Sequence, residues 1–351
     1  MSARFEVQCS VILIEDIGMG EADCQLMHRS CFNNWKGIYM SGKIYLTACS
    51  DARKVSDREE IEQLKELLAG YGLNVAESVY LYDDYAAGRE KAFELNSFFA
   101  EKAGEDKVTA IFDVSGGNVA NELLPYLDYD LIADSQTVFW GYSDLTTIIN
   151  AIYAKTGKAS VLYQARHLVG NEARQKECMA LLERGTFANV CESVAFGDDG
   201  GMNEGELDKG CGHKESLDKE NRNVGIDYEF LRGNELSGTL LGGNLRCFLK
   251  LAGTEYMPEL TDKVLLMEAL GGDIYSARTM LAQLDQLGVF NKVRGILVGT
   301  FTALMKEGQY ESFLDLLLSR IPKDMPVAVT KDVGHGRDAK AIVIGADIRL
   351  K

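Results

Sequence analysis

The sequence lacks a long apolar run. None of its hydrophobic stretches approaches the roughly 18 residues that a membrane-spanning helix needs. The first ten residues also lack the basic start and apolar core of a signal peptide, so we expect a cytoplasmic protein with no membrane partner. Basic runs are absent too, and the net charge is −16, which argues against a nucleic-acid partner because such binding needs a positive surface.

Paired cysteines are also missing. The chain has eight cysteines but no CxxC pair, which favours reduced thiols over disulfides or a zinc site. Cys211 and His213 offer only two potential ligands within a polar segment, and a solvated loop explains them better than a metal does. We therefore expect no metal and no cofactor.

Alternating strand and helix patterns are present in the first half of the chain. Apolar runs alternate with segments whose apolar residues recur at helical spacing, an order that predicts a parallel sheet covered by helices. The expected strands are 43–48, 75–82, 108–114 and 137–140, and the expected helices are 57–69, 88–102 and 144–155.

The composition changes over residues 198–223, which are rich in charged residues and glycine and predict a long mobile loop, either a functional lid or a tolerated insertion.

The order of strands and helices predicts an α/β fold class, with a Rossmann-like parallel sheet and a smaller α/β C-terminal domain. In that second block we expect strands at 264–268, 295–300, 327–329 and 341–344, and a helix at 277–287. The expected parts are an extension (1–42), an N-terminal domain (43–165), a linker with the mobile loop (166–235) and a C-terminal domain (236–351).

A glycine pair follows the apolar strand that ends near Val114. Gly116 and Gly117 allow a sharp turn at the carboxyl edge of the sheet, where open α/β folds bind ligands. Backbone amides at the helix start beyond the turn can stabilise an oxyanion. By itself, such a pair is also typical of an ordinary tight turn.

The segment 116–130 resembles the LD-carboxypeptidase pattern of two glycines, a nucleophile position, a leucine pair and an aspartate. Gly-Tyr-Ser-Asp at 141–144, Gly-Gly-Asn-Leu at 242–245 and Gly-Thr-Glu-Tyr at 253–256 are similar to further motifs of that family, in the same order. The Leu-Pro-Tyr-Leu-Asp-Tyr run and the asparagine at 121 are closer to the microcin C immunity branch. The resemblance covers residue 43 to the C-terminus.

By this resemblance the triad consists of residue 120 as nucleophile, Glu268 and His335. His335 is the expected general base, Glu268 holds its imidazole, and the amides of Gly117 and Asn121 are the expected oxyanion hole. Position 120, however, is alanine, which has no oxygen to attack with. Ser115 lies before the glycine pair and is a poor substitute.

Further residues at the sheet edge are expected to contact substrate. Ser143 and Asp144 could instead cap the helix that begins there, and Asn244 could instead have a structural role in its turn. The expected substrate-binding residues are Gly116, Tyr142, Ser143, Asp144 and Asn244.

The resemblance implies a serine peptidase that hydrolyses a carboxy-terminal amide of a small peptide, inactive as written because of Ala120. The substrate is expected to be a murein tetrapeptide or a microcin-like peptide nucleotide, and the protein a homodimer. The alternative is a non-catalytic protein that still binds a small peptide or nucleotide.

Overall fold

The structure is a computed structural model that describes residues 42–101, 108–183 and 225–351. All of these residues belong to one compact unit, Met40–Lys351. The expected extension over 1–42 lies outside the described residues except for Gly42, and the expected loop over 198–223 lies wholly outside them.

Six strands form the first sheet, in the order β11-β5-β4-β3-β1-β2. Strands β1 to β5 are parallel, and β11 joins the edge of β5 in the antiparallel direction. Five of the six residues of β3 are buried, as expected for a parallel strand that is covered on both faces. The strands are β1 Lys43–Thr47, β2 Asn74–Glu77, β3 Val108–Asp113, β4 Val138–Gly141, β5 Ser160–Leu162 and β11 Ile342–Ile344.

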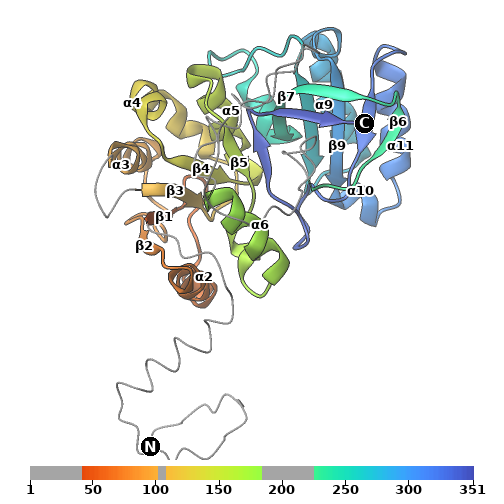
Figure 1. Ribbon diagram of the computed structural model, residues 1–351. Coiled ribbons are helices and arrows are strands. Elements are labelled where there is room, and N and C mark those ends of the chain that lie inside the picture. The colour runs from red at the N-terminus through yellow and green to blue at the C-terminus, as the bar shows by residue number, and fades with distance from the viewer. Residues whose placement is uncertain (1–41, 102–107, 184–224) are drawn as a thin grey trace, which may run out of the picture. The chain divides into compact units, whose positions relative to one another are not determined.

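Helices cover both faces of this sheet. In Figure 1, α3, α4 and α5 lie above the strands, and α2 and α6 lie below them. Helix α2 buries Ile61, Leu64 and Leu68, which share one face at helical spacing. The helices are α2 Arg58–Gly70, α3 Gly88–Ala100, α4 Tyr129–Asp134, α5 Thr146–Thr156 and α6 Glu172–Glu183, with short 3-10 turns η2 Val55–Asp57, η3 Ala120–Tyr126, η4 Ser143–Leu145 and η5 Ala165–Leu168.

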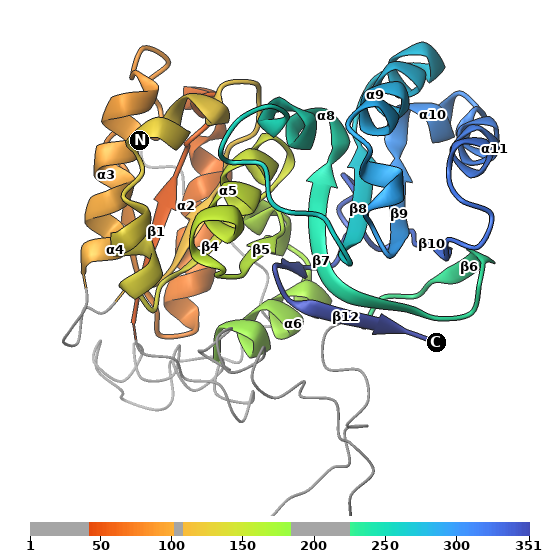
Figure 2. The ribbon, with the colours of Figure 1, turned by 90° about the horizontal axis from the view of Figure 1, so that it is seen from above.

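The second sheet has the order β12-β7-β8-β9-β10-β6. Strands β7 to β10 are parallel, and β12 and β6 close the two edges in the antiparallel direction. All six residues of β8 are buried. Figure 2 shows β7, β8 and β9 side by side with α9 next to them. The strands are β6 Glu229–Arg232, β7 Leu236–Asn244, β8 Val264–Ala269, β9 Gly295–Phe301, β10 Val327–Val329 and β12 Asp347–Leu350.

The helices of the second sheet follow its strands in sequence. Helix α9 begins after Asp273, whose carboxylate accepts the Ser276 N–H at 2.8 Å and caps the first turn. The helices are α8 Leu245–Phe248, α9 Ile274–Gln286, α10 Thr302–Lys306 and α11 Tyr310–Arg320, with 3-10 turns η6 Leu249–Leu251 and η7 Val289–Asn291.

The two sheets are joined where α5 packs on β7. The buried amide of Asn150 donates to the Gly242 carbonyl and accepts the Gly242 N–H, both at 2.9 Å. A Cβ on Gly243 would lie 2.8 Å from the hydroxyl oxygen of Thr146. Glycine at 243 therefore permits the close approach that brings the ends of β4 and β7 together.

The predicted α/β class with two sheets is confirmed. Within the predicted linker over 166–235, the structure has two regular elements, α6 and β6. The strand predicted at 341–344 is present as β11, but it completes the first sheet rather than the second. Its apolar pattern shows only that the strand is buried, and pairing with β5 is a tertiary choice.

Candidate functional site

A strained turn carries Ser143 at the carboxyl end of β4. Gly141 ends the strand, Tyr142 is extended, and Ser143 has φ +56°, after which η4 and α5 begin. Left-handed backbone is uncommon for a residue other than glycine, and it is a feature of functional turns. A Cβ on Gly141 would lie 2.6 Å from the Leu145 Cβ, so the turn requires glycine there. This strand-turn-helix geometry is that of a nucleophile elbow, which exposes a serine hydroxyl at the sheet edge.

His335 lies between this serine and a buried carboxylate. Its Nδ1 is 2.8 Å from Glu268 Oε2, and its Nε2 is 3.2 Å from Ser143 Oγ. Glu268 is fully buried at the end of β8, and the imidazole is 9% exposed. With Nδ1–H donating to the carboxylate, Nε2 is free to accept the serine proton. Serine, histidine and glutamate thus form a continuous hydrogen-bonded chain.

Tyr142 packs against the same histidine. The two ring centroids are 4.6 Å apart, and Tyr142 is 5% exposed. Burial first, and then the negative charge of Glu268, raise the pKa of the Tyr142 phenol well above its usual value. The Tyr142 hydroxyl lies beside this carboxylate. The ring therefore supports the imidazole, and the phenol stays protonated beside the carboxylate.

Ala120, the expected nucleophile position, is bonded through its backbone to Asp144, the residue that follows Ser143. It is fully buried at the start of η3, within the hydrophobic core, and its N–H donates to Asp144 Oδ2 at 2.9 Å. The ring nitrogens of His335 are bonded to Glu268 and Ser143, and the nucleophile role expected at residue 120 stays a prediction. The serine that contacts the Glu268–His335 pair is Ser143, for which the sequence predicts a substrate contact or a helix cap.

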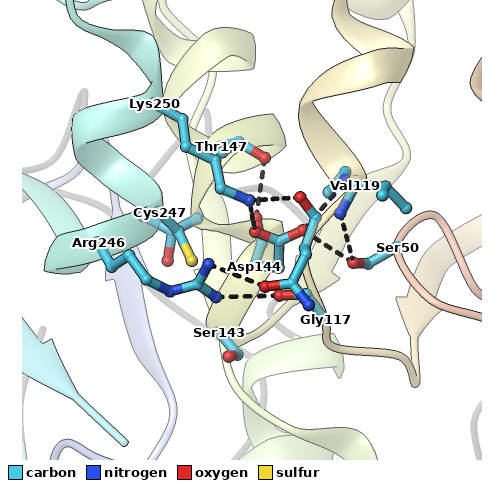
Figure 3. A network of polar contacts seen from close by, with 12 residues as sticks. Ser50, Gly117, Val119, Ser143, Asp144, Thr147, Arg246, Cys247 and Lys250 are labelled. Carbon is cyan, nitrogen blue, oxygen red and sulfur yellow. Dashed lines mark hydrogen bonds and ion pairs between the residues drawn. The ribbon is translucent and has the colours of Figure 1, made fainter. Parts of the chain in front are cut away.

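Asp144 holds the turn that carries Ser143 in place through buried polar contacts. Its carboxylate is fully buried and accepts the Ser50 hydroxyl at 2.8 Å and the Ala120 N–H, while Lys250 pairs with its other oxygen (Figure 3). Its carbonyl accepts the Thr147 hydroxyl at 2.8 Å. Because both carboxylate oxygens are engaged by the protein, Asp144 positions the chain around Ser143.

The glycine pair lies beside Ser143. A Cβ on Gly116 would be 3.8 Å from the Ser143 Cβ, and one on Gly117 would be 2.1 Å from the Asp51 carboxyl carbon. Gly117 also has φ +144°, a value that L side chains rarely adopt. The loop therefore needs glycine at 117 to pass Asp51 and reach the serine. Asn121 is exposed on η3.

Basic side chains from the second sheet hold this loop. Arg246 donates through Nη2 to the Gly117 carbonyl at 3.0 Å and through Nη1 to Asn118 Oδ1 at 2.9 Å. Lys250 donates to the Asn118 carbonyl at 2.7 Å. Sequence reasoning missed both residues. Their spacing of four along one short helical segment was the available signal, but nothing local pointed to the loop as their partner.

Asn244 and Ser115 have structural partners. The Asn244 side chain accepts the Cys247 N–H at 3.3 Å, so it caps α8, and its own N–H donates to Thr146 Oγ1 at 3.0 Å. Ser115 is fully buried, and its hydroxyl donates to Asp113 Oδ1 at 2.5 Å. These contacts agree with turn chemistry for Asn244 and leave Ser115 away from the Glu268–His335 pair.

Within the described residues, no three histidine, cysteine, aspartate or glutamate side chains group as a metal site would require. Cys211 and His213 lie outside that part of the chain. No helix in the described ranges is long and apolar enough to cross a bilayer.

Comparison with known protein families matches both halves of the chain. Residues 44–164 match the LD-carboxypeptidase N-terminal domain, and residues 237–350 match the LD-carboxypeptidase C-terminal domain. The chain belongs to the LD-carboxypeptidase family. The match of both domains confirms the predicted family membership. The family is one of peptide-cleaving enzymes of the serine peptidase type.

Two relatives are similar to most of this chain. It is 29% identical to a protein of Treponema pallidum named as a carboxypeptidase, over 88% of this chain and 90% of that protein. It is 26% identical to the microcin C7 self-immunity protein MccF of Escherichia coli, over 76% and 78% of the two chains.

Solved structures share the fold of this chain. MccF in its wild-type apo state superposes with a TM-score of 0.68 at 22% identity, over 89% of this chain and 93% of that one. An MccF-like protein from Streptococcus pneumoniae, solved in complex with AMP, has a TM-score of 0.65 at 19% identity, over 89% and 96%.

Proposed function

We propose that this LD-carboxypeptidase is an active serine peptidase in which Ser143, rather than residue 120, is the nucleophile. The observation that carries the proposal is the chain of contacts from Ser143 Oγ through His335 to Glu268, at 3.2 and 2.8 Å. A side-chain oxygen in a left-handed turn, bonded to a base that a buried carboxylate orients, is the arrangement of a serine triad. Ala120 then carries no catalytic penalty.

In the reaction, Ser143 Oγ attacks the carbonyl carbon of the scissile amide as its proton moves to His335 Nε2. Glu268 accepts the Nδ1–H and stabilises the imidazolium that forms. Nε2 then gives the proton to the leaving amine, and the amide C–N bond breaks. Water, activated by the same histidine, hydrolyses the acyl-enzyme ester and restores the serine.

Backbone N–H groups around Ser143 complete the site in this proposal. The Asp144 N–H follows the nucleophile directly, the usual position for one oxyanion donor in an elbow. The Gly116–Gly117 loop, beside Ser143, supplies the second. Asn121, the other expected donor, is exposed on η3, and we do not assign it this role.

We propose a carboxy-terminal amide of a small peptide as the substrate. One relative of Bacillus subtilis is named for murein peptide carboxypeptidase activity, and MccF has been solved with aspartyl sulfamoyl adenosine and with glutamyl sulfamoyl guanosine. These names support two candidates, a murein tetrapeptide and an aminoacyl nucleotide. By resemblance to the family we also propose that the protein is a cytoplasmic homodimer, which light scattering on the full chain tests for its oligomeric state.

The test compares the full chain with Ser143→Ala and Ala120→Ser, using both substrate candidates. We expect turnover by the unaltered chain and a loss of about 10⁶-fold in kcat for Ser143→Ala. Ala120→Ser combined with Ser143→Ala should restore nothing. No turnover by the unaltered chain on either substrate, or full activity of Ser143→Ala, would contradict the proposal and favour a non-catalytic binding protein.

A further inference from the structure

We propose that Arg246 binds the negatively charged group next to the scissile amide of the substrate, which is a carboxylate in a peptide or a phosphoryl or sulfamoyl group in a nucleotide conjugate. The proposal rests on the proposed function, since it assigns a substrate class to the Ser143 site. Neither the sequence motifs nor the family resemblance pointed to this residue.

The position of Arg246 carries the first part of the argument. Its Nη2 donates to the carbonyl of Gly117, and the preceding Gly116 has only the Ser143 side chain within 4 Å of its Cβ position. In Figure 3, the guanidinium extends from the segment that carries Cys247 and Lys250 toward Gly117. Two hydrogen bonds to the loop therefore fix the Arg246 guanidinium beside Gly117, and the adjacent Gly116 borders Ser143.

Arg246 has no acidic partner among the described residues, whereas the nearby Lys250 has one. Lys250 pairs with the buried Asp144 carboxylate. Among the described residues, Arg246 makes no ion pair, and both of its acceptors, Gly117 O and Asn118 Oδ1, are neutral. Asp51, the acidic side chain bonded to this loop, accepts the Asn118 N–H at 3.0 Å and forms no ion pair with Arg246. In a chain of net charge −16, a fixed and unpaired cation at the site favours an anionic ligand.

The donors left on Arg246 suit such a ligand. A guanidinium has five N–H donors, and the two contacts to the loop use two of them. The side chain is exposed, so the remaining three can reach a ligand. The planar fork of arginine matches carboxylate and phosphoryl oxygens, and the bonds to the loop already fix its orientation.

A purely structural role for Arg246, holding the Gly117–Asn118 loop, makes a different prediction from anion binding. Loss of a structural contact would weaken every ligand of the site by a similar factor. Loss of an anion-binding contact would weaken only ligands that carry the anion. The ratio of affinities for a charged and an uncharged form of one ligand separates the two roles.

The experiment uses the full chain with Ser143→Ala, which cannot turn substrate over, and measures binding by calorimetry. One pair of probes is the murein tetrapeptide with a free carboxy-terminus and the same peptide as its carboxamide. The other pair is AMP and adenosine. Each is titrated into the Ser143→Ala chain and into the same chain with Arg246→Gln, Arg246→Lys or, as a matched control, Arg278→Gln on α9.

We expect the charged member of at least one pair to bind about tenfold or more tightly than the uncharged member, with the ratio falling toward one in Arg246→Gln. Arg246→Lys should retain part of the preference, and Arg278→Gln all of it. The pair that responds identifies the source of the anion. The proposal is overturned if neither pair shows the preference, or if Arg246→Gln weakens both members equally. Failure of the proposed function is separate, since it would appear as absent turnover by the unaltered chain.

Discussion

Position 120 carries a methyl group, whereas position 143 carries a hydroxyl that lies 3.2 Å from His335 Nε2. Both residues follow a strand of the first sheet, and both are near Asp144, which accepts the Ala120 N–H and directly follows Ser143. The side chain of residue 120 is in the core, whereas Ser143 is half-buried at the histidine. Of these two side chains, only that of Ser143 carries an oxygen that can attack a carbonyl, and this oxygen is bonded to His335.

Ala120→Ser should therefore destabilise the protein without adding activity. The site is fully buried among apolar side chains, and a hydroxyl placed there without a partner costs about 1–3 kcal/mol. Thermal unfolding should show a lower Tm, and hydrolysis by the otherwise unaltered chain should not rise above its original rate. A gain of activity that depends on His335 would return the nucleophile role to position 120.

At the scale of elements, the turn from β4 into α5 determines where Ser143 lies. Gly141 has no room for a side chain, because a Cβ would meet the Leu145 Cβ at 2.6 Å and a Phe139 ring carbon at 3.0 Å. The turn can keep its geometry only if these contacts are relieved. A small displacement here moves the serine relative to His335.

Gly141→Ala should consequently lower both stability and kcat. Overpacking of this kind costs about 1–3 kcal/mol, and the shifted serine should lose its bond to His335 Nε2. Gly70→Ala is the matched control, since a Cβ at the last residue of α2 meets nothing within 4 Å. Urea unfolding and steady-state kinetics compare the two variants, and equal behaviour would show that the elbow tolerates a side chain.

At the scale of the whole molecule, the site exists because the two sheets are held together. Ser143 comes from the first sheet, and Glu268 ends a strand of the second. The Asn150 amide links α5 to β7 through two hydrogen bonds to the Gly242 backbone. After the strands β7 to β10 of the second sheet, the chain returns to the first sheet, where β11 pairs with β5.

Asn150→Ala should destabilise the fold by about 2–4 kcal/mol, because it leaves the buried Gly242 N–H and carbonyl without partners. Asn96→Ala is the control. The Asn96 amide also makes two backbone hydrogen bonds, to Tyr126 and Asp128, but near the surface where water can replace them. Chemical denaturation should give a much smaller change for Asn96→Ala, and similar values for the two would argue against a special role of the junction.

The buried thiols predict a loss of stability at alkaline pH. Burial, and then the charge of Asp144, raise the pKa of Cys247 to about 12, and burial chiefly raises the pKa of Cys49 and Cys178 above the usual range. Above the thiol pKa of the unfolded chain, near ~8.5, the unfolded state loses these protons and the native state keeps them. Stability is therefore complete below that pH and falls as pH rises, by up to about 1.4 kcal/mol per thiol for each pH unit.

Urea unfolding under reducing conditions at pH 7.5, 8.5, 9.5 and 10.5 tests this expectation. The free energy of unfolding should decrease over the last two steps, and a variant with the three cysteines replaced by alanine should decrease less steeply. A constant free energy between pH 8.5 and 10.5 would show that these thiols ionise equally in both states.

Elements with strong local patterns could be predicted from the amino-acid sequence. Strands β3 and β8 consist mostly of apolar residues, α2 has its apolar residues on one face, and all three lie close to their predicted bounds. The ordered motifs were enough for the family, and the Glu268–His335 pair was predicted from their positions and is present at 2.8 Å.

The serine that contacts that pair, and the sheet that each strand joins, depend on contacts between distant parts of the chain. Ser143 and His335 are 192 residues apart, so no local pattern relates them. The glycines of β7 weaken its strand signal, yet they allow α5 to approach, and β11 pairs with β5 because the chain returns across the junction. Periodicity reports whether a residue is buried, whereas its partner depends on how distant elements pack.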